Sequence, residues 1–481
     1  MTHMTETVCH EITRHDDVKT PETSSFAVEN VGTSWFLNVS KTGPPMRSLE
    51  FENPTHPTVI NVVNTTSDPS GPKITGTMSQ GTAAQLMSIG PQDRFLSLNP
   101  QMTFFRKAYR RHTNFAVECF EENFATDSFV FGTTNVCSLG KHGDLLGNIS
   151  LRVVLPNLGI AGGTWVDAVG YVLFTAIRMR IGETVVQTHE RLWYDIEDKL
   201  FLSEGHIDGV NAMIGRGVTL ATDSSHEIYV PLKLMCCDRN SGRQQFVPSM
   251  SLDHWTNVVI EIDAESLEKC VNLPTGTSLP VINPDTGTPV SSTSGYLLVD
   301  NVYVDAIERR RFSESPTTLM FEAPMDVDQV SYTTTTEGNV PVSTVTIDMR
   351  ELNMPVRYFA IVVYPETYET AFEYLDEIRS GTFFIGPDRQ FSIRSQPYFS
   401  YMQPYDHFTR ITSNVAAYSF ALDAGGWQPN GCLNFAALSS PTFKFTLKDS
   451  GNSKPLKVKL FASCINWVNF HDGKCALGYD S

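Results

Sequence analysis

The sequence predicts an all-β fold of antiparallel sheets. From about residue 115 onward, apolar and polar residues alternate with a period of two, which is typical of strands with one buried and one solvent-facing side. Gly and Pro turn formers separate these runs, and helical periodicity is clear in only two places. Many short strands, few helices and no strand–helix alternation favour sandwiches or barrels, jelly rolls included.

The clearest local prediction is a β-hairpin over residues 177–189. Isoleucine and methionine alternate with arginine over 177–181, the pair Gly182-Glu183 follows, and a second strand-like run covers 184–189. Glycine at the first central position suits a type II′ turn, which matches the twist of the two flanking strands.

Further strands are predicted by the same alternation over residues 258–263 and 344–349. Near the C-terminus, residues 443–448 and 456–460 flank the segment 449–455, which is rich in turn-forming residues. We therefore expect a second hairpin there.

Two segments have helical periodicity. Residues 191–202 place their apolar side chains on one side of a helix, and residues 366–379 do the same, with Gly381 as a stop signal. Both are predicted to be short crossover helices between strands.

Length and composition limit the classes of protein. The 481 residues suffice for two large or three average domains, and 41 % hydrophobic with 19 % charged residues is ordinary for globular proteins. The net charge of −17 argues against a surface that coats nucleic acid. No secretory signal or membrane-spanning run is recognisable, so a soluble chain is expected. Nine cysteines without a CxxC motif indicate reduced, mostly buried thiols in a cytosolic compartment.

Two segments differ in composition from the rest. Residues 1–77 are rich in Ser, Thr and Pro and predict a polar N-terminal arm, with short apolar runs at 35–39 and 59–63 that could dock on a partner. Residues 272–295 are also rich in Ser, Thr, Pro and Gly, with one charge, and composition alone would place a domain boundary there.

No catalytic constellation is recognisable, and neither a cofactor nor a metal ion is expected. The nearest approaches are the glycine-rich stretch 159–163, the cluster Cys9, His10 and His15, and the pair Cys236 and Cys237. The first lacks the lysine of a phosphate-binding loop, and the second lies in the polar arm without a scaffold. The third is interpreted as buried structural thiols, because neighbours in a strand point to opposite faces.

Two basic clusters stand out in this acidic chain. The first comprises Arg106, Lys107, Arg110, Arg111 and His112, interleaved with Phe104, Phe105 and Tyr109, and the second comprises Arg309, Arg310 and Arg311. Such clusters could stack on nucleic-acid bases or contact anionic lipid headgroups. We favour the alternative that the guanidinium groups pair with carboxylates at a subunit or domain contact.

Three N-x-Ser/Thr sequons begin at Asn38, Asn64 and Asn148. They are possible glycosylation sites, but without a signal segment they would not meet the usual oligosaccharide machinery. Chance occurrence is therefore the favoured interpretation.

Four blocks of sequence share the pattern of one protein family. The first, over 95–116, contains Asn99, Pro100, Gln101, Phe104, Phe105, Tyr109, Arg110, Arg111, His112, Asn114 and Phe115. The second, over 296–312, contains Glu308, Arg309, Arg310 and Phe312. The third, over 418–435, contains Ser419, Phe420, Pro429, Gly431, Asn434 and Phe435, and the fourth covers 466–479. Together they resemble the major capsid proteins of nucleocytoplasmic large double-stranded DNA viruses, although Asn430 and Ala436 stand where that family commonly has hydroxyl residues.

The resemblance implies a double jelly roll, two consecutive eight-stranded antiparallel barrels with a few short helices in the connecting loops. The first barrel would cover residues 78–311, with 272–295 as a loop insertion, and the second would cover 312–481, after an N-terminal arm at 1–77. The family thus moves the boundary suggested by composition to near Phe312. It also implies that the motif residues are structural and that no residue is catalytic.

The function implied by the resemblance is that of a structural capsid protein. Three chains would form a pseudo-hexagonal capsomer of an icosahedral shell, in contact with neighbouring capsomers, minor capsid proteins and an internal membrane, without sequence-specific nucleic-acid binding. Its location would be the virion, with assembly in the host cytoplasm. A minor capsid paralogue at a special lattice position, a jelly-roll carbohydrate-binding protein and a cupin-type metal enzyme are the alternatives.

Overall fold

The structure is a computed structural model, and it describes a defined set of residues: 26–31, 34–39, 50–51, 90–107, 109–237, 245–327, 330–337, 340–365, 372–412, 414–426, 428–448 and 456–479. The chain divides into two compact units, residues 1–108 and 109–481. The described part of the first unit contains a three-stranded antiparallel sheet and one helix. These elements are β1 (Phe26–Val31), β2 (Ser34–Val39), β3 (Glu50–Phe51) and α2 (Pro91–Ser97).

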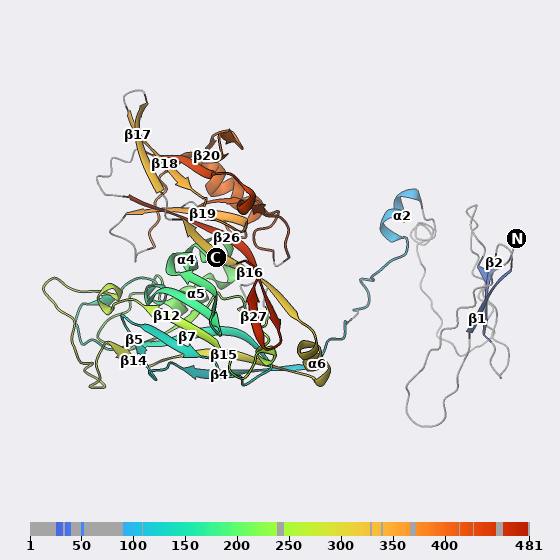
Figure 1. The fold of residues 1–481 in the computed structure, drawn as a ribbon, viewed down its shortest axis with the longest axis horizontal. Helices are drawn as coiled ribbons and strands as arrows, with labels where there is room; N and C mark the ends of the chain where they lie inside the picture. The colour runs from blue at the N-terminus through green and yellow to red at the C-terminus, as the bar shows by residue number, and fades with distance from the viewer. Residues whose placement is uncertain are drawn as a thin grey trace, which may run out of the picture. The chain divides into compact units, whose positions relative to one another are not determined.

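The larger unit begins with two four-stranded antiparallel sheets (Figure 1). One has the order β11-β7-β15-β4, and its strands are β4 (Phe115–Asn123), β7 (Leu145–Leu155), β11 (His226–Pro231) and β15 (Gly295–Val304). The other has the order β10-β9-β12-β6, and its strands are β6 (Thr134–Ser138), β9 (Phe174–Ile181), β10 (Thr184–Glu190) and β12 (Val258–Ala264). The first and last of these eight strands, β4 and β15, are neighbours, which is the connectivity of a jelly roll.

The inner faces of these sheets form one apolar core. Along β7, alternate residues such as Leu151 and Val153 are buried, and Ile177 of β9 and Ile260 of β12 join the same cluster. The period of two read from the sequence therefore has its expected cause, one face in the core and one toward solvent. The predicted hairpin is confirmed: β9 and β10 pair antiparallel, and Gly182 has a φ of +61°.

A second pair of antiparallel sheets follows (Figure 1). One has the order β16-β26-β19-β23, and its strands are β16 (Thr317–Val327), β19 (Pro355–Pro365), β23 (Ala416–Ser419) and β26 (Leu456–His471). The other has the order β17-β18-β25-β20-β21, and its strands are β17 (Val330–Glu337), β18 (Val340–Asp348), β20 (Ile378–Ile385), β21 (Asp388–Arg389) and β25 (Pro441–Leu447). Here too the first and last long strands, β16 and β26, are neighbours. The predicted all-β class with jelly-roll topology is confirmed.

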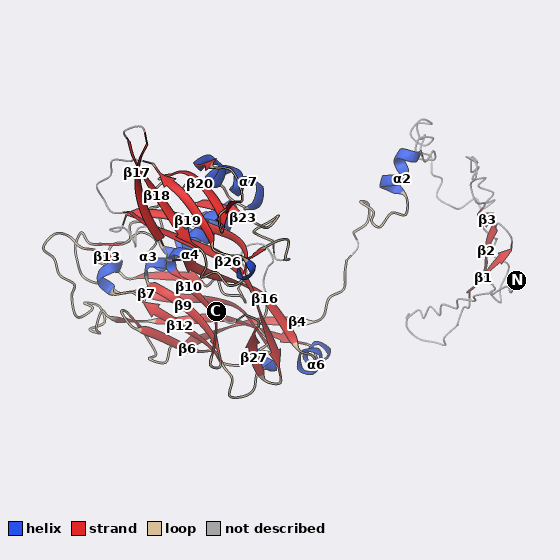
Figure 2. Cartoon of the chain, turned by 45° about the horizontal axis from the view of Figure 1, so that its top comes forward, coloured by secondary structure: helices blue, strands red, loops and turns tan. Residues whose placement is uncertain are grey.

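Short elements complete the framework, and strands dominate it throughout (Figure 2). The short strands are β5 (Phe129–Val130), β8 (Thr164–Trp165), β13 (Val271–Asn272), β14 (Ser292–Thr293), β22 (Arg394–Ser395), β24 (Leu433–Asn434) and β27 (Lys474–Leu477). The α-helices of this unit are α3 (Val169–Val172), α4 (Arg191–Phe201), α5 (Glu204–Ile214), α6 (Ala306–Glu314) and α7 (Gln403–His407). Helix α4 confirms the prediction for 191–202. Within the described ranges, every helix is too short or too polar to span a bilayer.

The predicted hairpin over 443–460 is wrong. Both strands exist, but β25 pairs with β18 and β20, whereas β26 pairs with β16 and β19 in the other sheet. Alternation identifies a strand and its buried face, but it does not identify the pairing partner. In a jelly roll, consecutive strands often lie in opposite sheets. The turn-forming residues at 449–455 are compatible both with a hairpin and with a connection between sheets.

The predicted helix over 366–379 is also wrong where the structure describes it. Residues 372–377 have no regular structure, β20 begins at Ile378, and residues 366–371 lie outside the described set. Buried Phe372 and Tyr374 pack against the first jelly roll, so tertiary contacts override the local periodicity. Gly381 lies within β20 and does not end a helix. Its lack of a side chain is needed there, because a Cβ would lie 2.8 Å from the ring of Phe443.

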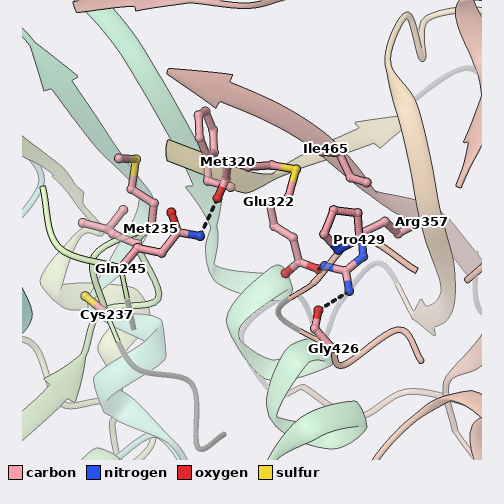
Figure 3. A pocket seen from close by; sticks show the side chains of 11 residues that line it. Met235, Cys237, Gln245, Met320, Glu322, Arg357, Gly426, Pro429 and Ile465 are labelled. Atoms are coloured by element: carbon pink, nitrogen blue, oxygen red, sulfur yellow. Dashed lines mark hydrogen bonds and ion pairs between the residues drawn. The ribbon is translucent and has the colours of Figure 1, made fainter. Parts of the chain in front are cut away.

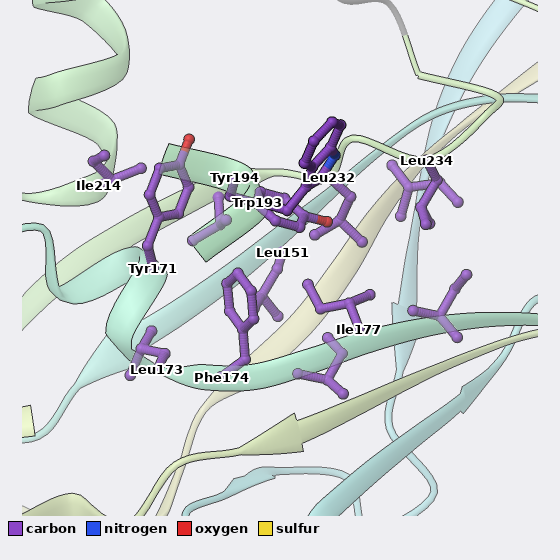
Figure 4. Close-up of a cluster of buried hydrophobic side chains, with 14 of the residues drawn as sticks. Leu151, Tyr171, Leu173, Phe174, Ile177, Trp193, Tyr194, Ile214, Leu232 and Leu234 are labelled. Carbon is purple, nitrogen blue, oxygen red and sulfur yellow. The ribbon is translucent and has the colours of Figure 1, made fainter. Parts of the chain in front are cut away.

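The two jelly rolls share a buried junction made by α4 and the outer face of β19. Trp193 is fully buried, and its ring lies 6.1 Å from Tyr358 and 6.0 Å from Phe461. Figure 4 shows Trp193 and Tyr194 with Phe174 and other side chains of the first core. One apolar cluster therefore continues from the first jelly roll into the junction.

We expect Trp193→Ala to lower the free energy of unfolding by about 3–5 kcal/mol, because it opens a cavity in the junction. The matched control is Trp255→Ala, whose side chain is 90 % exposed and whose loss should cost under about 0.5 kcal/mol. Denaturant titration followed by circular dichroism measures both changes. Equal effects of the two substitutions would contradict the assignment of Trp193 to the junction.

Candidate assembly surfaces

The three arginines of the second basic cluster lie on α6 and pair with carboxylates of the same chain. Asp305 caps the helix by accepting hydrogen bonds from the backbone N–H groups of residues 307 and 308. Arg309 contacts Asp144 at 2.8 Å, and the other two pairs, Arg310 with Glu314 and Arg311 with Glu308, are 2.6 Å long. The guanidinium groups therefore do pair with carboxylates, but within the chain, and two of the three pairs lie on one helix and not at a subunit or domain contact. These charges are largely neutralised and form no free basic patch for a polyanion.

The first basic cluster has a different environment. Phe104 is 89 % exposed, Phe105 is 99 % exposed and Tyr109 is 86 % exposed. Within the described part of the chain, no ion pair involves the arginines and lysine of this cluster, so the hypothesis of carboxylate pairing finds no partner inside this chain. The ring of His112 lies 5.8 Å from that of Phe115, where β4 begins. Asn99, Pro100, Gln101 and Asn114 are exposed as well.

The third sequence motif forms a braced loop beside β19. The Ser419 backbone N–H donates to Gln403 Oε1 at 3.0 Å, and the Phe420 N–H donates to the carbonyl of Arg357 at 2.8 Å. The Phe420 ring packs with Phe359, Phe383 and Phe435 at centroid distances of 5.8–6.1 Å. These motif residues therefore hold the loop to the sheet.

The turn of this motif depends on Asn430 and Gly431. Asn430 Nδ2 donates to the carbonyl of Asp423 at 2.8 Å, and its own carbonyl accepts the Leu422 N–H at 3.3 Å. Gly431, two residues after Pro429, has a φ of +134°, and a Cβ there would lie 3.0 Å from the Phe420 carbonyl oxygen. Asn430 departs from the family pattern but closes the turn with its amide.

Asn434 and Ala436 meet in the short 3₁₀ helix that ends this motif. Asn434 Oδ1 accepts the Ala436 N–H at 3.1 Å and thereby caps the helix Phe435–Ala437. The cap needs only the backbone of residue 436, so the absence of a hydroxyl group there leaves it intact.

Arg357 ties this loop to the junction (Figure 3). Its Nη1 donates to Glu322 Oε1 at 2.9 Å, and its Nη2 donates to the carbonyls of Ala424 and Gly426 at 2.9 and 2.7 Å. Ser463 Oγ also donates to Glu322 Oε1, at 3.0 Å. A cavity of about 70 Å³ lies beside these groups, room for a few water molecules at most. The charged groups therefore serve packing between strands and loop.

A second polar cluster stabilises the junction from α4. Asp195 is fully buried and pairs with Lys199 at 2.8 Å and with Arg216. Lys199 also donates to the carbonyl of Phe372 at 3.1 Å, and its ammonium lies 4.0 Å from the centre of the Tyr374 ring. Burial alone would raise the pKa of Asp195, but the two cations outweigh burial and hold that pKa below its ordinary value. An ion network thus fastens the second jelly roll to the first.

The weak catalytic candidates have structural roles where the structure describes them. The stretch 159–163 is a loop in which the Gly163 N–H donates to the Ile160 carbonyl at 3.3 Å. Cys236 and Cys237 are buried, with sulfur atoms 3.9 Å apart. The cluster of residues 9, 10 and 15 lies outside the described residues. Within the described residues, no three His, Cys, Asp or Glu side chains gather as metal ligands do.

The glycosylation sequons lie in three different contexts. Asn148 is half-buried in β7, and its Nδ2 donates to Asp300 Oδ2 of the neighbouring strand at 3.3 Å. Its amide is already engaged by this hydrogen bond, which favours the interpretation as chance. Asn38 lies in β2, and Asn64 lies outside the described residues.

Comparison with protein families decides what this framework is. A model described as the major capsid protein N-terminus matches residues 103–305, and a model described as the large eukaryotic DNA virus major capsid protein matches residues 308–466. The chain belongs to this family of capsid proteins. It is therefore a structural component of a virion and not an enzyme.

Individual capsid proteins support this assignment. The major capsid protein of Pyramimonas orientalis virus is 28 % identical over 433 residues, covering 83 % of this chain and all of the relative. The major capsid protein of Paramecium bursaria Chlorella virus 1 is 26 % identical, covering 76 % of this chain and 87 % of the relative.

Solved structures agree on the fold. A quasi-atomic model of the PBCV-1 capsid matches with a TM-score of 0.64 at 20 % identity, covering 79 % of this chain and all of that one. The Faustovirus major capsid protein matches with a TM-score of 0.60 at 10 % identity, covering 80 % and 96 %. At these identities the likeness concerns the fold alone.

We expect Asp195→Asn to cost this capsid protein about 3–5 kcal/mol of unfolding free energy at neutral pH, because it leaves buried cations unpaired. Because the pKa of Asp195 is lower in the folded state, its ionised carboxylate stabilises the fold at pH values above the unfolded-state pKa of about 3.9. This stabilisation is lost as the pH falls from that value through the lower folded-state pKa. The difference between wild type and variant should therefore shrink below about pH 4.

Thermal unfolding between pH 3 and pH 7 checks this expectation. Glu314→Gln is the control, since it removes an exposed ion pair and should cost under about 1 kcal/mol at any pH. A wild-type profile that stays parallel to that of Asp195→Asn down to pH 3 would contradict the role assigned to the buried carboxylate.

Proposed function

We propose that this protein forms a homotrimeric capsomer with a pseudo-hexagonal outline in an icosahedral shell. The observation that carries the proposal is the junction, because Trp193, Tyr358 and the Asp195 network join two similar jelly rolls into one unit. Three such units around an axis present six similar barrels, and a closed ring of identical chains satisfies every equivalent contact. A trimer with this outline can pack side by side in a hexagonal lattice, and this structural function requires no catalytic residue.

We propose that the jelly rolls divide at residues 311 and 312. Strand β15 ends at Val304, β16 begins at Thr317, and α6 lies between them, which supports a first roll within 78–311 and a second within 312–481. Residues 273–291 carry only an isolated bridge between Ile282 and Pro289, which favours the reading of 272–295 as a loop insertion. Residues 1–77 would then be the N-terminal arm.

We propose that the partners of the capsomer are neighbouring capsomers, minor capsid proteins and an internal membrane below the shell, with assembly in the host cytoplasm. Many weak lateral contacts suffice for such a lattice, because each later contact is effectively intramolecular. Sequence-specific nucleic acid is not expected, since the net charge is −17 and Arg309, Arg310 and Arg311 pair within the chain.

Native mass spectrometry of the purified chain tests the trimer. We expect a species of about 160 kDa, three times the chain mass of 53.5 kDa, that persists on dilution to low micromolar concentration. A uniform 53.5 kDa species at every concentration and salt would contradict the capsomer. A stable trimer that fails to form lattices with its own kind would instead favour a minor capsid paralogue.

A further inference from the structure

Strand β4 has an open edge. It is the last strand of the order β11-β7-β15-β4, and all nine of its residues pair with β15 on the other side. Among the described residues, no further strand pairs with it. The thiol of Cys137 reaches the carbonyls of residues 122 and 123, so the uncovered part of the edge is 115–121. Backbone N–H and C=O groups along this stretch are free to receive another strand.

The open edge has no proline, no bulge and, among the described residues, no covering strand. Phe115 and Val117 are each 54 % exposed. Native proteins generally twist, cover or charge such an edge, since it recruits other chains. The charges of the uncovered stretch are both negative and come from Glu118 and Glu121.

The segment 104–112 has the properties of a strand that could occupy this edge. It contains no Gly or Pro, it includes three aromatic residues, and the exposed fractions of Phe104, Phe105 and Tyr109 range from 86 to 99 %. Its nine residues are long enough to pair with the seven-residue open stretch 115–121, which spans about 23 Å in extended form. We name this segment the basic arm, because it carries Arg106, Lys107, Arg110 and Arg111.

Charge favours a second copy of this chain as the partner. The basic arm complements the acidic edge of β4, whereas two arms repel each other. Each copy carries one arm and one edge, so an arm-to-edge contact is head-to-tail, and it forms a closed ring when the rotation between copies is a third of a turn. A lipid surface fits less well, because an anionic bilayer would attract the arm and repel the adjacent glutamates.

We propose that the basic arm of one copy adds as a strand to the open edge of β4 in the next copy, in a closed ring of three. Main-chain hydrogen bonds supply the contact, and the aromatic side chains cover the exposed Phe115 and Val117. This inference rests on the proposed trimer and identifies the surface that holds it.

Cysteine cross-linking in the full-length protein tests the contact. Cys119 is a natural exposed thiol on β4, and Phe105, Lys107 and Tyr109 can each be replaced by cysteine in turn along the arm. A disulfide forms only where Cα atoms approach to about 4.4–6.8 Å. Oxidation with copper phenanthroline and oxygen, which takes up the two electrons, should link most chains of at least one variant into dimers and trimers on a denaturing gel.

Two matched controls test whether the cross-link depends on Cys119. Cys119→Ser in the arm-cysteine background should abolish the ladder, and Cys432→Ser, which removes another exposed thiol, should leave it unchanged. A monomer band alone, or a ladder that survives Cys119→Ser, overturns the inference. If native mass spectrometry still gives a trimer in that case, the capsomer stands and only the assigned contact fails.

Charge exchange gives an independent readout. Arg110→Glu with Arg111→Glu should lower the cross-linked fraction about ten-fold, and adding Glu118→Lys with Glu121→Lys should restore most of it. Failure of the second pair to restore cross-linking overturns the charge argument. Flotation with vesicles of phosphatidylcholine and phosphatidylserine tests the lipid alternative, and arm-dependent flotation of a protein that shows no Cys119 ladder would replace our inference with a membrane contact.

Discussion

The architecture depends on one sheet that is buried on both faces. In β19, Phe359, Ile361 and Val363 point into the second jelly roll, while Tyr358 and Ala360 point into the junction with the first. A strand in this position cannot have a solvent face, so it is apolar along its length except at Arg357, whose charge is paired with Glu322. This strand therefore contributes apolar surface to two cores. Separating the two jelly rolls would expose its junction-facing side chains to water, at a cost in free energy.

The polar groups of the junction follow from the same constraint. Arg357 and Glu322 are each about 9 % exposed, and Asp195 is fully buried, so each charge must find its partners inside the protein. Such pairs add little net stability compared with apolar residues of the same size, but an unpaired member is costly. Their effect is to fix one geometry between the two jelly rolls. A capsid subunit requires a fixed orientation between its two jelly rolls, because every copy in the lattice makes the same contacts and would share any deviation.

The sequence predicted those elements whose pattern is local. The hairpin at 177–189 and helix α4 were predictable because their turn residues and their one-sided apolar patterns lie within short stretches of sequence. β19 gave no alternation, since both of its faces are buried, and the irregular segment 372–377 resembled a helix because its aromatic spacing serves the junction instead. Strand pairing across a jelly roll is also not local, which explains the wrong hairpin at 443–460. The network around Asp195 had no sequence signal, because its partners come from distant segments.

The family motifs separate into two physical kinds. In the third motif, Ser419, Phe420, Asn434 and Phe435 have partners within the chain, so the fold itself accounts for their presence. Around Phe104 and Tyr109, the side chains are large, apolar and exposed, so the described fold gains nothing from them. Exposed aromatic surface of this extent is unfavourable in water and is characteristic of contacts made with another molecule. The segment that leads into β4 is therefore better understood as part of an interface than as part of the monomer.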